Sequence, residues 1–128
     1  MIIPFYAACL ALIFIALSVR TLSLRKSLGI AIGDRGDNAM LRAMRVHANF
    51  AEYTPLSLLL LFMLEQQSAS PLLLHALGAA LLVGRFVHAV GVSSPREDLR
   101  LRVTGMALTF TALGGAALAL LYHSFTSA

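Results

Sequence analysis

The sequence contains few charged residues, and this scarcity decides its class. Of the 128 residues, 12% are charged while 59% are hydrophobic, and the mean hydropathy is +0.82. A soluble domain carries charge on about a quarter of its residues. A separate soluble domain is therefore excluded, and we expect one integral membrane domain over residues 1–128.

Cysteine is also nearly absent. Cys9 is the single cysteine, so an internal disulfide is excluded, and the sequence suggests no metal site. The net charge is +4, but the basic residues lie in clusters between apolar runs and are not spread among polar surface residues. This placement is typical of a membrane protein and argues against nucleic acid as a partner.

A basic residue before the first apolar run is missing as well. The first basic residues, Arg20, Arg25 and Lys26, follow that run. A secretory signal peptide has the opposite order, with its positive charge first. We therefore expect a retained membrane helix with its N-terminus outside.

Four segments are long enough to cross a bilayer. At a rise of 1.5 Å per residue, a hydrocarbon core of about 30 Å needs about 20 residues. The expected spans are about 3–22, 38–67, 71–92 and 97–122. The second span begins at Asp37 or Asn38, both good helix-capping residues. Small residues such as Gly84 and Gly105 predict close contact between the third and fourth spans. The sequence thus predicts an all-α bundle of four transmembrane helices.

The basic residues give this bundle an orientation. All ten belong to the loop after the first span, the loop after the third span, or the flanks of these loops: Arg20, Arg25, Lys26, Arg35, Arg42, Arg45, Arg85, Arg96, Arg100 and Arg102. Neither terminus nor the turn between the second and third spans contains one. The positive-inside rule places both loops in the cytoplasm and both termini outside.

Polar side chains share one face of the second span, where apolar residues are expected. On a helical wheel at 100° per residue they occupy an arc of about 100°. They are Arg42, Arg45, Asn49, Glu52 and Tyr53, and we call them the polar stripe. His47 lies on the opposite face, so we interpret it as a packing or subunit-contact residue. A charge in hydrocarbon costs about 2.5–3.5 kcal/mol, so the stripe needs partners, water or a function.

Two interpretations of the polar stripe are open at this point. In the first, Arg45 and Glu52 belong to a structural ion-pair network with neighbouring helices. In the second, the stripe binds an anion, because Glu52 is the one acid well inside a span while four or five arginines enter from the same side. Excess positive charge in a membrane-embedded cleft favours an anionic ligand.

The same residues carry a family resemblance. The pattern Arg45-x-His47-x-Asn49-x-x-Glu52-x-x-Pro55 resembles the signature of the MAPEG family, membrane-associated proteins in eicosanoid and glutathione metabolism. Further residues that fit the pattern are Arg42 before it, Tyr53 within it, Arg85-x-x-His88 at the end of the third span, and Arg102. The resemblance covers essentially the whole chain. The preceding Gly-Asp-x-Gly-Asp is most similar to bacterial members, which implies a bacterial inner membrane protein.

The resemblance implies a fold and a ligand. The fold would be a left-handed four-helix bundle that assembles as a homotrimer. The ligand would be glutathione, bound between neighbouring subunits near the cytoplasmic side. A lipophilic second substrate would enter from the membrane lipid.

The resemblance also implies roles for the site residues. Arginines such as Arg42, Arg45 and Arg85 grip the carboxylates of glutathione. Glu52 would accept the ammonium, Asn49 would bond the peptide, and Tyr53 would bond a carboxylate or the backbone. His88 would orient Arg85 or the ligand, although a packing role fits it equally. Arg102 would be the catalytic residue, because a positive group near sulfur favours the nucleophilic thiolate.

Two positions depart from the family pattern. Related enzymes often have tyrosines where this chain has Val92 and Met106. The leading expectation is a glutathione transferase or peroxidase that acts on lipophilic electrophiles or lipid hydroperoxides. The alternative is a non-catalytic protein on the same scaffold that binds an anionic metabolite or lipid. A small transporter subunit ranks below both, because no span is broken at mid-membrane.

Overall fold

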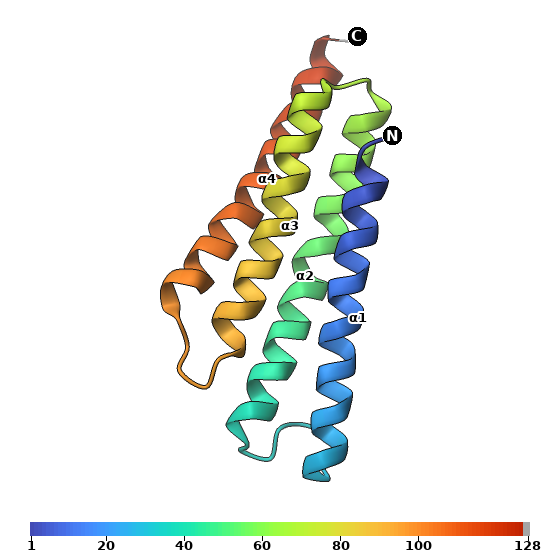
Figure 1. Ribbon diagram of the computed structural model, residues 1–128. Helices are drawn as coiled ribbons and strands as arrows, with labels where there is room; N and C mark the ends of the chain where they lie inside the picture. Colours follow the sequence, from blue (N-terminus) through green and yellow to red (C-terminus); the bar gives the residue numbers. More distant parts are fainter. Residues whose placement is uncertain (127–128) are drawn as a thin grey trace.

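The computed structural model describes residues 1–126 as a bundle of four long helices joined by short connections (Figure 1). The helices are α1 (Ile3–Leu28), α2 (Asn38–Gln66), α3 (Pro71–Ser93) and α4 (Leu99–Thr126). The prediction of an all-helical bundle with four helices is confirmed. Among the described residues, α1, α3 and α4 are long and apolar enough to cross a membrane. The α2 helix is less apolar as a whole, because its first half carries the polar stripe.

Two helix starts lie where the sequence predicts them. The Asp37 side chain accepts a hydrogen bond from the Met40 amide at 2.8 Å, so α2 begins at Asn38. The Ser70 hydroxyl accepts one from the Leu73 amide at 3.2 Å, and Pro71 occupies the first position of α3. Both caps satisfy amides that have no partner inside the helix.

The first helix continues beyond the predicted end at residue 22, to Leu28. It ends at Gly29, whose φ of 64° is the left-handed conformation common after a helix. The Arg25 guanidinium donates to three loop carbonyl groups at 3.0–3.4 Å, those of Ile30, Ala31 and Gly33. A basic side chain in the last turn also interacts favourably with the helix dipole. The polar residues that suggested a loop therefore stabilise the last turns of α1.

The fourth helix begins at Leu99, two positions after the predicted start at Glu97. The Asp98 carboxylate accepts hydrogen bonds from the amides of Arg100 at 3.0 Å and Leu101 at 3.4 Å. This side chain therefore caps the helix. Glu97 precedes the helix and is free to reach other elements.

The helices α2 and α3 form the centre of the bundle. Both α1 and α4 pack against this pair, whereas α1 and α4 do not contact each other within residues 1–126. The closest approach joins α3 to α4. A Cβ atom added at Gly105 would lie 2.6 Å from the His88 amide nitrogen and 2.7 Å from the Gly84 carbonyl oxygen. The predicted glycine contacts between these helices are confirmed.

The two ends of the bundle differ. The start of α1, the end of α4 and the α2–α3 turn lie at one end, which we call the terminal end (Figure 1). There the Glu65 carboxylate accepts hydrogen bonds from the amides of Ile2 and Ile3. The Tyr6 hydroxyl lies 2.9 Å from His75 Nδ1. The two basic loops lie at the opposite end, which we call the loop end, as the charge distribution requires for loops on one side of a membrane.

Candidate functional site

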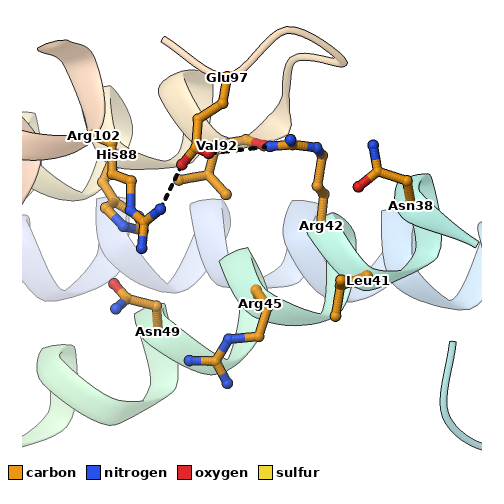
Figure 2. Close-up of a pocket in the computed structure, with 9 residues that line it drawn as sticks. All are labelled: Asn38, Leu41, Arg42, Arg45, Asn49, His88, Val92, Glu97 and Arg102. Atoms are coloured by element: carbon orange, nitrogen blue, oxygen red, sulfur yellow. Dashed lines mark hydrogen bonds and ion pairs between the residues drawn. The ribbon is translucent and has the colours of Figure 1, made fainter. Parts of the chain in front are cut away.

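A polar cleft opens between α2, α3 and α4 at the loop end (Figure 2). Its volume is about 230 Å³. The lining residues are Asn38, Leu41, Arg42, Arg45, Asn49, His88, Val92, Glu97 and Arg102. The cleft thus brings together Arg42, Arg45 and Asn49 of the polar stripe with residues of the third and fourth helices.

Arg42 points from α2 toward the end of α3. Its terminal nitrogen donates to the Val92 carbonyl oxygen at 3.3 Å and lies 3.8 Å from a carboxylate oxygen of Glu97 (Figure 2). Its Nε atom is buried and has no hydrogen-bond partner among the residues that the structure describes. A buried donor without a partner is costly, so this guanidinium has capacity for a further acceptor.

Arg102 also binds Glu97, with a guanidinium nitrogen 2.6 Å from a carboxylate oxygen. The carboxylate therefore lies between two arginines, one from α2 and one from α4. The sequence predicts only a helix start at Glu97, so it does not indicate that the carboxylate belongs to the site. A signal for its role was present in the sequence: Glu97 lies five residues before Arg102, at the cytoplasmic side where the arginines are expected.

Arg85 lies deeper, with only 1% of its surface exposed. Its guanidinium donates to the Asn49 side-chain oxygen at 2.7 Å, the Thr109 hydroxyl at 2.9 Å and the Met106 sulfur at 3.2 Å. The same group lies 5.8 Å from the centre of the Tyr53 ring. Within residues 1–126 no carboxylate pairs with it, so the site contains a buried cation held by neutral partners.

Asn49 connects this buried cation to the cleft. Its side chain lines the cleft and accepts from Arg85. Tyr53 is farther inside and does not line the cleft. Its ring packs edge-on against Phe110, with ring centres 5.4 Å apart. The structure therefore gives Tyr53 a contact with Arg85 and places it behind the cleft wall.

The polar stripe divides into two parts. Arg42, Asn49 and Tyr53 face the other helices, whereas Arg45 and Glu52 are exposed. Arg45 still lines the rim of the cleft, and Figure 2 shows its side chain directed away from Glu97. Glu52 does not line the cleft. Neither residue forms an ion pair within residues 1–126. The exposed pair therefore leaves charge on the outer surface of the bundle.

The two histidines of the motif have different surroundings. His88 is 4% exposed and lines the cleft beside Arg102. His47 faces α1, where its ring nitrogen lies 3.0 Å from the Ser18 hydroxyl and its ring stacks on Phe14 at 4.8 Å. The prediction that His47 has a packing role is confirmed.

The two positions that lack tyrosine still take part in the site. The Val92 carbonyl oxygen accepts from Arg42, and the Met106 sulfur accepts from Arg85. These acceptors hold the arginines, but they offer a bound anion no hydroxyl donor. The polar groups that line the cleft are therefore those of arginine, asparagine, histidine and glutamate side chains.

The chain is similar to known proteins over most of its length. The model of the MAPEG family matches residues 3–122. Inner membrane protein YecN of Escherichia coli strain K12 is 33% identical over 113 residues, which cover 88% of this chain and 85% of the relative. YecN of Escherichia coli O6:H1 matches to the same extent. No solved structure matches the chain.

Proposed function

The chain belongs to the MAPEG family and is an integral inner membrane protein, and from this premise we propose that it binds glutathione or a closely similar anionic thiol in the cleft. We further propose that it activates the thiol as a transferase or peroxidase. The observation that carries the proposal is the charge of the cleft. Three arginines line it against one acid, Glu97, and the buried Arg85 lies directly behind.

An excess of arginine in a partly buried cleft favours an anion. Arginine presents five donors in a planar fork that fits carboxylates by paired hydrogen bonds. The unpartnered Nε atom of Arg42 supplies one such donor. The unused donor of Arg42 and the lack of a carboxylate at Arg85 within residues 1–126 favour an anionic ligand over a purely structural ion-pair network.

The chemical groups of glutathione fit the cleft in number and sign. It has two carboxylates, one ammonium, one thiol and a peptide backbone. Arg42 and Arg45 are the proposed carboxylate partners, and Asn49 is the proposed partner of the peptide. Arg85 and His88 would position Asn49 and the wall of the cleft. Glu97 lies where it can accept the ammonium, which is a role that the resemblance gives to Glu52.

Glu52 requires a second copy of the chain to join the site. It is exposed on α2 and does not reach the cleft of its own chain. A charged side chain facing lipid is expensive, so an exposed carboxylate on a membrane helix indicates a polar neighbour. We propose that a homo-oligomer, a trimer in the form implied by the family, places Glu52 against a ligand shared between subunits.

Arg102 is the proposed catalytic residue. Its guanidinium would stabilise the thiolate, and the thiol proton would leave to water at the open mouth of the cleft. The thiolate would then attack a lipophilic electrophile, forming a carbon–sulfur bond while the leaving group departs with the bonding electron pair. With a hydroperoxide, two thiols would be oxidised to a disulfide while the peroxide is reduced to an alcohol and water.

The test compares glutathione binding and turnover in the detergent-purified protein. Ligand at 100 times its Kd should raise the free energy of unfolding by about 2.7 kcal/mol. Arg42→Gln should weaken this stabilisation, and Arg102→Gln should lower turnover with 1-chloro-2,4-dinitrobenzene or cumene hydroperoxide more than binding. Arg100→Gln is the matched control, because Arg100 is exposed at the same end and does not line the cleft. No stabilisation of the wild type by millimolar glutathione would refute glutathione as the ligand, and another anionic thiol would then have to bind in the cleft.

A non-catalytic role on the same scaffold is the second candidate. It is favoured by the 2.6 Å contact that occupies Arg102 with Glu97, and by the missing hydroxyl donors at Val92 and Met106. In that case glutathione or another anion would bind, and Arg42→Gln would weaken this binding. The wild type would have no measurable turnover, so no variant could lower it.

A further inference from the structure

A second groove lies between α1 and α3, apart from the polar cleft. Its volume is about 630 Å³. The lining residues are Ile13, Ala16, Leu17, Arg20, Phe86, Ala89, Val90, Ser93, Ser94 and Pro95. None of them lines the polar cleft. The proposed function therefore does not use this groove.

The groove is apolar along its length and polar at one end. On α1 it runs from Ile13 to Arg20, and on α3 from Phe86 to Ser93. Seven residues of a helix rise about 10 Å, so both walls extend by this length along the bundle. The polar groups, those of Arg20, Ser93 and Ser94, all lie at the loop end. This gradient matches an amphiphile with its polar head at the membrane surface and its chain in the hydrocarbon.

Arg20 gives the polar end a positive charge. Its guanidinium donates to the Ser93 hydroxyl at 2.6 Å and to the Ser93 carbonyl oxygen at 3.3 Å. Within residues 1–126 no carboxylate pairs with it. Two of its five hydrogen-bond donors are thus in use, and these bonds to Ser93 of α3 position the guanidinium at the mouth of the groove. An arginine fixed in this way and lacking a counter-charge is suited to a phosphate group.

We propose that this groove binds one anionic phospholipid of the surrounding membrane. The headgroup phosphate would bind Arg20 together with the hydroxyl groups of Ser93 and Ser94. One acyl chain would lie between Leu17 and the exposed ring of Phe86. Basic side chains near the cytoplasmic surface attract anionic lipids, and the loop end is the end that the positive-inside rule places there.

The experiment measures lipid binding to the delipidated protein in detergent by native mass spectrometry. Phosphatidylglycerol and phosphatidylcholine with the same acyl chains are titrated in parallel. Wild type should bind phosphatidylglycerol about fivefold more tightly, the effect of one arginine near an anionic headgroup. Arg20→Gln should remove this preference, and Arg20→Lys should keep part of it. Arg100→Gln should behave as wild type, because Arg100 lies at the same end outside the groove.

Two further measurements test whether the acyl chain is needed for binding and whether the groove is occupied by a lipid or by a protein partner. Glycerol phosphate, which lacks acyl chains, should not bind at millimolar concentration. Ala16→Phe, at an exposed position of the groove wall, should weaken binding of both lipids without unfolding the protein. Equal binding of the two lipids, or a preference that survives Arg20→Gln, would overturn the proposal. So would an Ala16→Phe variant that changes only the oligomeric mass, since a second copy of the chain would then fill the groove.

Discussion

The carboxylate of Glu97 lies 2.6 Å from the guanidinium of Arg102, and this pair closes one side of the polar cleft. The same carboxylate lies 3.8 Å from Arg42. An anionic ligand therefore meets two arginines that already share one internal anion. A ligand that binds both of these arginines would either displace Glu97 or use it for its own positive group.

Glu97→Gln separates these two possibilities. Because the side chains of Glu97 and Arg102 are 29% and 51% exposed, the pair contributes little to stability, and we expect a change below about 1 kcal/mol. Affinity for a simple anion such as sulfate should rise severalfold, since both arginines are freed. Glutathione affinity should fall if Glu97 binds its ammonium. Isothermal titration calorimetry with both ligands measures the two effects, and unchanged affinity for both would exclude Glu97 from ligand binding.

Arg85→Met tests the buried cation. The substitution leaves the Asn49 oxygen without its 2.7 Å donor and also removes the arginine donor of the Thr109 hydroxyl and the Met106 sulfur. A buried acceptor that loses its donor costs about 1–3 kcal/mol. Unfolding in a denaturing detergent, followed by circular dichroism, should show a loss of this size. Arg100→Met, at an exposed position, should show none. Equal stability of the two variants would mean that the buried arginine has a negligible net effect on stability.

Gly105→Ala tests the close contact between α3 and α4. The added Cβ would lie 2.6 Å from the His88 amide and 2.7 Å from the Gly84 carbonyl, both backbone atoms that cannot rotate away. Overpacking of this kind costs about 1–3 kcal/mol. Gly114→Ala is the matched control on the same helix, because its Cβ would have no neighbour within 4 Å. Thermal unfolding should separate the two variants, and a stable Gly105→Ala protein would contradict the tight contact.

Glu52→Leu tests the exposed charge on α2. If Glu52 contacts a second copy of the chain, the variant should shift the oligomer toward smaller species in size-exclusion chromatography with light scattering. If it faces lipid only, the change should stabilise the monomer, because a charge leaves the hydrocarbon. Leu59→Ala, at an exposed apolar position of the same helix, is the control for a general loss of surface packing.

The helices and their caps could be predicted in large part from the sequence. Asp37 and Pro71 mark helix starts because their chemistry acts on neighbouring residues, and a local pattern records it. The end of α1 could not be predicted in this way. Arg25 stabilises the last turns of α1 by donating to carbonyl groups of the following loop, and a basic residue at this position is also typical of a loop.

The candidate site was predicted in its residue types but only partly in its arrangement. The helical wheel places Arg42, Arg45 and Glu52 within one arc, but it does not say which part of the arc another helix covers. The packing of α3 and α4 divides the arc, so that Arg42 is turned inward while Arg45 and Glu52 stay outside. Glu97 could not be placed from periodicity, because it lies before the helix and its direction depends on the connection from α3.

The contacts that join the helices differ between the two ends of the bundle. Hydrogen bonds of Glu65 join the start of α1 to the end of α2, and the hydrogen bond of Tyr6 with His75 joins α1 to α3. At the loop end, arginine side chains make the corresponding contacts, Arg20 with Ser93 and both Arg42 and Arg102 with Glu97. The groups that join the helices at the loop end are therefore the same groups that the proposed anionic ligands would bind. An anion bound at the loop end would replace contacts between helices, whereas the contacts at the terminal end would stay unchanged.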